Sequence, residues 1–199
     1  MSRLKGFFPT LIYAAPLGGA TASLDRELLD EVHKIGARDA AGRRWSERNY
    51  PGGYTSYGSL DQLHRMSSTL VALRERIDRH VRRYAAALEW DLRGRRLEMS
   101  DCWANVMRRG CAHSLHLHPQ SVISGTYYVK TPRGASGLRF EDPRLSRFMA
   151  APQRRSGSHV IYPARAGHLV LFESWLRHEV PASAVTEERI SLSFNYRWD

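Results

Sequence analysis

Histidine is the residue type in this 199-residue chain whose spacing most directly indicates chemistry. His116 and His118 flank a single leucine, and residues two apart on a β-strand project from the same face. Two imidazoles from one strand then converge on one point, as a metal ion requires. With a third histidine, His178, the set has the open geometry of non-haem iron sites, with positions left for substrate and oxygen. The alternative is that His116 and His118 are partly exposed polar residues of an edge strand.

A second pair of residues that could take part in binding or catalysis, Arg189 and Ser191, follows His178 along the chain. In a strand the two side chains share a face. A buried guanidinium beside a hydroxyl is suited to bind a carboxylate, because it offers two charge-assisted hydrogen bonds and one further donor. The alternative is that Arg189 forms a surface ion pair with Glu187 or Glu188.

The first half of the chain has the apolar periodicity of helices. Residues at helical spacing predict a helix from Leu24 to about Ile35, with Ser23 as its N-cap. Residues 37–59 are predicted to form an irregular connection. A longer stripe predicts a second helix that begins near Asp61. The residues of this stripe are Leu63, Met66, Leu70, Leu73, Ile77, Val81, Tyr84 and Leu88.

After Gly94 the pattern changes to short β-rich segments separated by turn residues. Strands are predicted over 97–107, 113–118, 121–129, 138–140, 168–172, 180–181 and 189–196, and a long loop over 144–166. Many short strands with long connections favour a mainly β fold, a sandwich or jelly roll with helices covering one outer sheet. We therefore expect a single domain, 1–199, in which residues 1–96 give helical support and residues 97–199 form the jelly-roll core.

Charge and composition restrict the partners. The chain carries 30 Lys and Arg against 20 Asp and Glu, a net charge of +10, but its arginines are spread without a basic block, which argues against nucleic acid. The chain has no apolar run long enough to span a membrane, and no signal peptide is recognised. Two cysteines, Cys102 and Cys111, give neither a disulfide framework nor a metal-binding pair, so a reducing cytoplasmic location is expected.

Several motifs occur in an order that resembles a known family. They are His-x-His-Pro at 116–119, followed by segments 123–129, 140–144, 167–180 and 189–195. This order resembles the 2-oxoglutarate- and Fe(II)-dependent oxygenases of the small bacterial and phage type, which are similar to prolyl hydroxylases. The resemblance covers residues 100–196 and implies a double-stranded β-helix core of the cupin-like jelly-roll kind. It also implies Fe(II) and 2-oxoglutarate as cofactors.

The resemblance assigns roles to particular residues. By position it implies that His178 is the distal iron ligand and that Arg189, with Ser191, holds the distal carboxylate of 2-oxoglutarate. Tyr128 matches a tyrosine that touches the same carboxylate in prolyl hydroxylase-like relatives. Asn105, from its own place on the strand before the histidine pair, is a candidate to hydrogen-bond the cosubstrate or the substrate; the alternative is a polar residue at the end of a strand.

One position departs from the wider superfamily, whose triad is His-x-Asp plus a distal His. Here the Asp position is His118, and a ligand set of three neutral imidazoles leaves more positive charge on the iron. The small bacterial subfamily shares His-x-His-Pro, so His118 is expected to be a ligand. Asp142, Glu141 and Glu179 stay open as carboxylate alternatives.

The implied activity is an oxygenase that hydroxylates an unidentified substrate, with succinate and CO2 as co-products. Two other classes stay open: a three-His non-haem iron dioxygenase that uses no 2-oxoglutarate, and a non-catalytic jelly-roll module that binds an anionic partner. The expected partners are O2 and a small-molecule or peptide substrate, and the arginines favour an acidic one. A homodimer is also left open.

Overall fold

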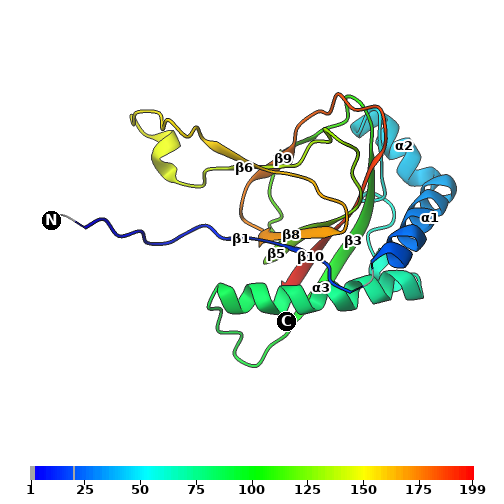
Figure 1. Cartoon of the computed structure of the whole chain (residues 1–199), viewed down its shortest axis with the longest axis horizontal. Coiled ribbons are helices and arrows are strands. Elements are labelled where there is room, and N and C mark those ends of the chain that lie inside the picture. The colour runs from blue at the N-terminus through cyan, green and yellow to red at the C-terminus, as the bar shows by residue number, and fades with distance from the viewer. Residues whose placement is uncertain (1–2, 20) are drawn as a thin grey trace.

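The computed structural model describes residues 3–19 and 21–199 and contains two antiparallel β-sheets, with α-helices packed against one of them (Figure 1). The six-stranded sheet has the order β1-β8-β5-β10-β3-β2, and the four-stranded sheet the order β4-β9-β6-β7. The strands of the larger sheet are β1 (Ile12–Pro16), β2 (Tyr54–Thr55), β3 (Leu97–Met107), β5 (Ile123–Lys130), β8 (His168–Glu173) and β10 (Arg189–Trp198). Those of the smaller sheet are β4 (His113–His116), β6 (Leu138–Glu141), β7 (His159–Tyr162) and β9 (His178–Val180). The predicted mainly β jelly roll is confirmed.

Strand β10 shows how the larger sheet separates two environments. Its even-numbered residues, such as Ile190 and Leu192, belong to a buried apolar cluster that includes the helices. Its odd-numbered residues Arg189, Ser191 and Ser193 line a cavity between the two sheets. Because side chains alternate along a strand, these three polar residues face that cavity together.

Helix α3 (Ser68–Ala87) covers the outer face of the larger sheet with the predicted apolar stripe. Ser67 caps it, accepting a hydrogen bond from the Leu70 amide at 3.2 Å. The prediction that this helix begins near Asp61 is wrong: a separate 3-10 turn occupies Leu63–Arg65, and Met66 is half exposed. Among the described residues, no helix combines the length and apolar character needed to cross a membrane.

The first helices differ from the sequence prediction in their bounds and number. Helix α1 (Ala22–Arg38) follows Thr21, so Ser23 lies inside the helix and is not its N-cap. The connection predicted for residues 37–59 contains α2 (Ala40–Asn49) and the short strand β2. Asp39 caps α2 by accepting a hydrogen bond from the Gly42 amide at 2.8 Å. The buried residues of α2 are Gly42 and Ser46, which produce no apolar period.

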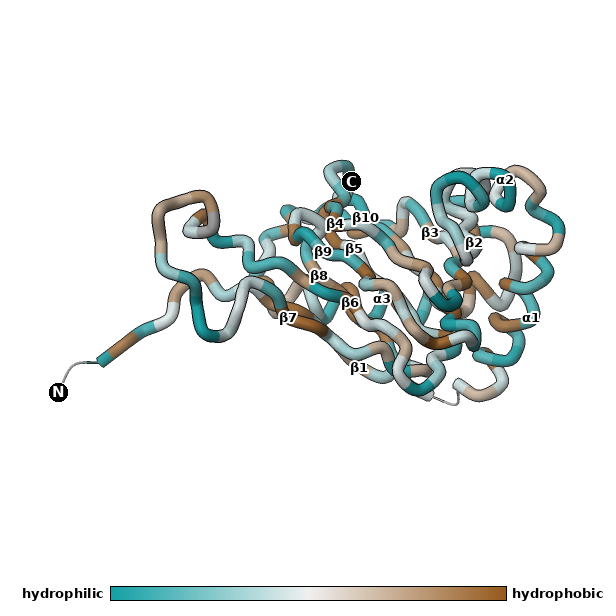
Figure 2. Tube along the Cα trace, turned by 90° about the horizontal axis from the view of Figure 1, so that it is seen from above, coloured by the Kyte–Doolittle hydropathy of each residue, from teal (hydrophilic) through white to brown (hydrophobic). Residues whose placement is uncertain are grey.

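Two extended segments project from the same end of the barrel (Figure 1). One is the N-terminal arm that precedes β1. The sequence analysis did not predict β1 itself. The other is the connection between β6 and β7, which holds a 3-10 turn at Leu145–Phe148. The loop predicted over 144–166 therefore contains a strand, β7, whose hydrophobic stretch is visible in Figure 2.

Candidate active site

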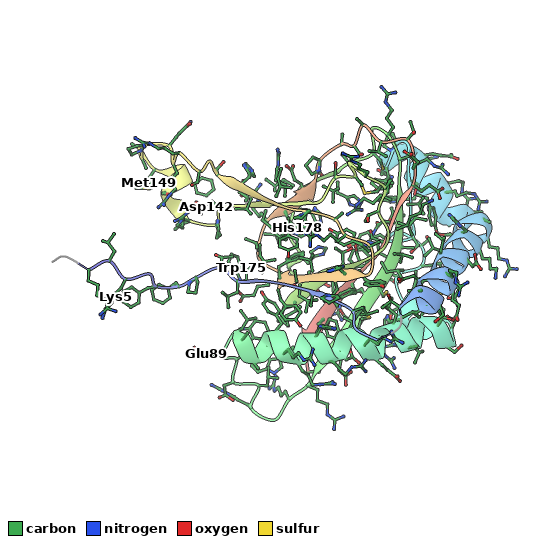
Figure 3. All side chains as sticks on the ribbon, viewed as in Figure 1. Lys5, Glu89, Asp142, Met149, Trp175 and His178 are labelled. Atoms are coloured by element: carbon green, nitrogen blue, oxygen red, sulfur yellow. The ribbon has the colours of Figure 1, made fainter. Side chains whose placement is uncertain are left out.

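Three histidines, two from the smaller sheet and one from the loop that follows β4, gather at one point. His116 ends β4 and is the cross-strand partner of His178, which begins β9; their ring centroids are 4.4 Å apart. One nitrogen from each of His116, His118 and His178 lies within 4.8 Å of the others. Figure 3 shows His178 between the two sheets. His118 lies beyond the end of β4, held by a 3.0 Å bond from its amide to the Ser174 carbonyl, so the convergence comes from cross-strand pairing and not from an i, i+2 spacing.

The protonation state of these imidazoles suits metal binding. The Nδ1 atoms of His116 and His178 lie 2.6 and 2.9 Å from the carbonyl oxygens of Ser114 and Leu176. A carbonyl only accepts, so each Nδ1 carries the hydrogen and each Nε2 keeps a free lone pair. Burial, reinforced by the neighbouring His116, lowers the pKa of His178 to about 3 and that of His118 to about 4. Both rings are therefore neutral at pH 7, the form that binds a metal.

The carboxylates considered as alternative ligands are engaged elsewhere. Glu141 forms an ion pair with Arg177 at 3.1 Å, Asp142 pairs with Arg144, and Glu179 pairs with Arg139. Within the described ranges, the group able to hold a metal consists of the three histidines and includes no acidic side chain.

Arg189 carries a buried positive charge near this cluster. Its side chain donates to the Met107 sulfur at 3.0 Å and to Ser191 Oγ at 3.4 Å, and its guanidinium carbon lies 4.9 Å from the centre of the Tyr128 ring. No carboxylate of the described residues forms an ion pair with it, and the proposed partner Glu188 binds Arg108 and His33 instead. Arg189 Nε and the Tyr128 hydroxyl are buried and have no hydrogen-bond partner among the described residues. A cation and two unsatisfied polar atoms in one place suit an anion.

One cavity between the sheets joins these groups. Its lining includes the three histidines, Arg189, Ser191, Asn105, His113, Thr126, Ser193 and Trp103. Asn105 reaches the cavity, but its Oδ1 accepts from Thr55 Oγ1 at 2.9 Å and its Nδ2 donates to Ser193 Oγ at 3.1 Å. Tyr128 lies behind Arg189 and is not part of the lining.

Sequence reasoning assigned no role to His113 and Tyr50. Their Nε2 and hydroxyl oxygen are 2.6 Å apart, and His113 lines the same cavity as the triad. Burial, with smaller contributions from His116 and Arg189, lowers the pKa of His113 to about 3. The sequence signal that could have placed His113 at the site is its position three residues before His116. Nothing in the sequence pairs His113 with Tyr50.

The comparisons with known proteins agree with this geometry. Residues 101–195 match the model of the family described as "Putative 2OG-Fe(II) oxygenase". A comparison with curated proteins finds no match.

Solved structures give the fold over nearly the whole chain. The prolyl-4-hydroxylase of Pseudomonas putida is 17% identical with a TM-score of 0.63, covering 94% of this chain and 92% of its own. HygX of Streptomyces hygroscopicus, crystallised with nickel and 2-oxoglutarate, is 11% identical with a TM-score of 0.61, at 94% and 83% coverage. The collagen prolyl hydroxylase of Paramecium Bursaria Chlorella virus-1 is 11% identical with a TM-score of 0.57, at 94% coverage of both.

Fold and site together define a double-stranded β-helix protein with a histidine-lined cavity between its sheets. Residues 101–195 match the 2OG-Fe(II) oxygenase family model, which confirms the resemblance read from the sequence. The two predicted cofactors, Fe(II) and 2-oxoglutarate, are those that the family description names.

Proposed function

We propose that this chain is an Fe(II)- and 2-oxoglutarate-dependent oxygenase that hydroxylates its substrate and releases succinate and CO2. One observation carries the proposal: Arg189, a buried cation without a carboxylate partner among the described residues, lines the same cavity as the three clustered histidines. A diacid that reaches the metal with one end and Arg189 with the other supplies the missing anion. A site for a metal alone has no use for that guanidinium.

The residues present fit both cofactors. Imidazole nitrogens are ligands that Fe(II) accepts, and His116, His118 and His178 are proposed to hold it. Arg189 and Ser191 are proposed to bind the distal carboxylate, and Tyr128, whose ring lies under the Arg189 guanidinium, to position that arginine. When bound, iron and 2-oxoglutarate supply oxygen activation and oxidative decarboxylation.

The chain's own contribution is positioning. The Ser114 and Leu176 carbonyls fix the orientation of two imidazoles. Asn105, held between Thr55 and Ser193, is proposed to present its amide to the cosubstrate or substrate from a fixed position. Trp103, whose buried ring has its centroid 6.0 Å from that of His118, is proposed to limit the access of water to the metal side of the cavity.

An anaerobic titration of the full chain tests this function. Fe(II) and 2-oxoglutarate are added in turn while visible absorbance is followed. We expect a weak charge-transfer band that requires both additions and disappears in His178→Ala. Iron bound without a band would favour the three-His dioxygenase that uses no 2-oxoglutarate. A chain that binds no iron would favour the non-catalytic binding module. Once the band is seen, candidate substrates are screened in air by succinate release and by mass increase of one oxygen atom.

A further inference from the structure

Tyr50 and His113 form a buried pair that none of the roles above uses. Tyr50 Oη lies 2.6 Å from His113 Nε2, and the two rings pack edge to face with centroids 4.5 Å apart. Tyr50 follows directly after α2 and is 4% exposed. His113 begins β4, the strand that ends at the metal-site residue His116.

The pair lies beside the histidine cluster, and its His113 lines the same cavity as Arg189. The ring centroid of His113 is 6.4 Å from that of His116. On its other side, Tyr50 belongs to the same buried cluster as Met107, whose sulfur contacts the Arg189 guanidinium. Because His113 lines the same cavity as the three histidines and Arg189, a ligand that fills this cavity lies next to His113.

The local packing holds Tyr50 in place. A Cβ at Gly53 would lie 2.5 Å from Cys111 Sγ and 2.8 Å from Tyr50 Cε1, so only glycine permits this approach. With its ring fixed, the Tyr50 hydroxyl can donate to His113 Nε2. Nδ1 then carries the imidazole hydrogen, and no described residue accepts it.

We infer that His113 is a further cosubstrate-binding residue, which donates its Nδ1 hydrogen to a carboxylate oxygen of 2-oxoglutarate, and that Tyr50 positions it. This inference rests on the proposed function. Tyr50 touches neither cofactor; it selects the tautomer and the ring orientation of His113. An anion in the cavity favours that tautomer, because the alternative directs a lone pair at the carboxylate.

The test compares two Tyr–His pairs in the full-length, Fe(II)-loaded protein under anaerobic conditions. Tyr50→Phe removes the hydroxyl at His113, and Tyr13→Phe removes an equivalent hydroxyl 2.8 Å from His80 Nδ1, outside the cavity. The readouts are the 2-oxoglutarate concentration that half-saturates the charge-transfer band and, separately, the affinity for Fe(II) alone. We expect Tyr50→Phe to raise the half-saturating concentration several-fold, with Fe(II) affinity unchanged, and Tyr13→Phe to change neither.

Substitutions of His113 test the donor itself. His113→Phe should raise the half-saturating concentration about 10-fold or more, the effect of losing a hydrogen bond to a charged group. His113→Asn keeps an N–H donor near the Nδ1 position and should recover much of this loss, which a purely structural role does not predict. Tyr50→Phe, which deletes one oxygen, keeps the test valid if His113→Phe fails to fold.

The inference is overturned if His113→Phe binds 2-oxoglutarate like the wild type while Arg189→Met does not; the proposed function then stands. It is also overturned if Tyr13→Phe weakens binding as much as Tyr50→Phe, since the effect is then one of general stability. A wild-type chain that binds iron but gives no band with 2-oxoglutarate overturns the proposed function, and this inference with it.

Discussion

Arg189 brings its charge into a site where no acidic side chain of the described residues meets it. A buried ion without a counter-charge costs several kcal/mol, even after the protein relaxes around it. Its contacts with a thioether, a hydroxyl and an aromatic face offset only part of this cost. We therefore propose that the chain gives up stability at this residue because Arg189 serves as a carboxylate site.

Arg189→Met should separate stability from binding. Without ligands, we expect the melting temperature to stay the same or rise, because methionine fills the site without a buried charge. With Fe(II) and 2-oxoglutarate at 100 times the wild-type dissociation constant, the wild type should gain about 2.7 kcal/mol and the variant far less. Thermal unfolding with and without ligands measures both. Arg108→Met, outside the cavity, is the control; a large loss of ligand-free stability in Arg189→Met would contradict the argument.

Asp39 is a second buried charged residue, but unlike Arg189 its carboxylate accepts several hydrogen bonds. Burial alone raises the pKa of its carboxyl, yet hydrogen bonds from Ser59, the Gly42 amide and Tyr54 lower it below the usual value. A lowered folded-state pKa stabilises the fold above the unfolded pKa of about 3.9, and the gain is lost as pH falls through the folded value.

Asp39→Asn should consequently destabilise the protein in a pH-dependent way. We expect a loss of about 1–2 kcal/mol at pH 7, from the charge-assisted bonds and part of the α2 cap. The difference from the wild type should stay constant down to about pH 5 and shrink below about pH 4, where the carboxyl becomes protonated. Urea unfolding of both proteins at several pH values measures this; a difference that grows on acidification would refute the assignment.

At the scale of elements, the sequence predicted those whose burial follows a simple period. The strand expected over 97–107 coincides with β3, and the stripe expected for the long helix is the buried face of α3. Helix α2 was not predicted because its buried residues, Gly42 and Ser46, form no apolar stripe. The N-cap at Asp39 stabilises its start. The short edge strands β1 and β7 lack a clear alternation of buried and exposed residues.

The sequence allowed us to predict which residues form the candidate site, but not how they are arranged in space. The three histidines and Arg189 were identified by type and order, and the structure brings them to one cavity. The cross-strand pairing of His116 with His178, which creates the cluster, depends on sheet register, and no local pattern encodes that register. The contact between Tyr50 and His113 joins residues that are 63 positions apart in the sequence, so it could not be predicted either.

Gly125 tests the packing of strand β5 at the centre of the larger sheet. A Cβ at this position would lie 2.7 Å from Leu171 Cδ2, from Phe194 Cε2 and from the Val170 carbonyl oxygen. Gly125→Ala should therefore cost about 1–3 kcal/mol or more, because a backbone atom cannot move aside like a flexible side chain. Gly6→Ala, where nothing lies within 4 Å, should change nothing. Denaturant midpoints compare the two; equal values would show that the sheet yields easily.

At the scale of the whole molecule, the largest apolar cluster is shared between the two halves of the sequence. Leu28, Leu73 and Ile77 from the helices pack with Leu169 and Leu192 from the strands. Neither half can bury its own apolar surface without the other. We therefore propose that residues 1–96 and 97–199 form one folding unit.

A single cooperative transition should follow from this shared core. Helix content followed by circular dichroism and tryptophan fluorescence should report the same midpoint in urea. A fragment of residues 97–199 alone should expose the outer face of its larger sheet and fail to fold. Two separate midpoints, or a stable 97–199 fragment, would show that the halves are independent.

Strand β7 has one further consequence, which concerns how the protein behaves in solution. It lies at the margin of the smaller sheet, and its Val160 and Ile161 are 62% and 63% exposed. An open strand edge with β-branched residues is a template for intermolecular β-pairing. At a net charge of +10 the molecules repel one another, but near 1 M salt this repulsion is screened beyond about 3 Å. Aggregation through β7 should thus set the upper limit on salt and protein concentration during storage.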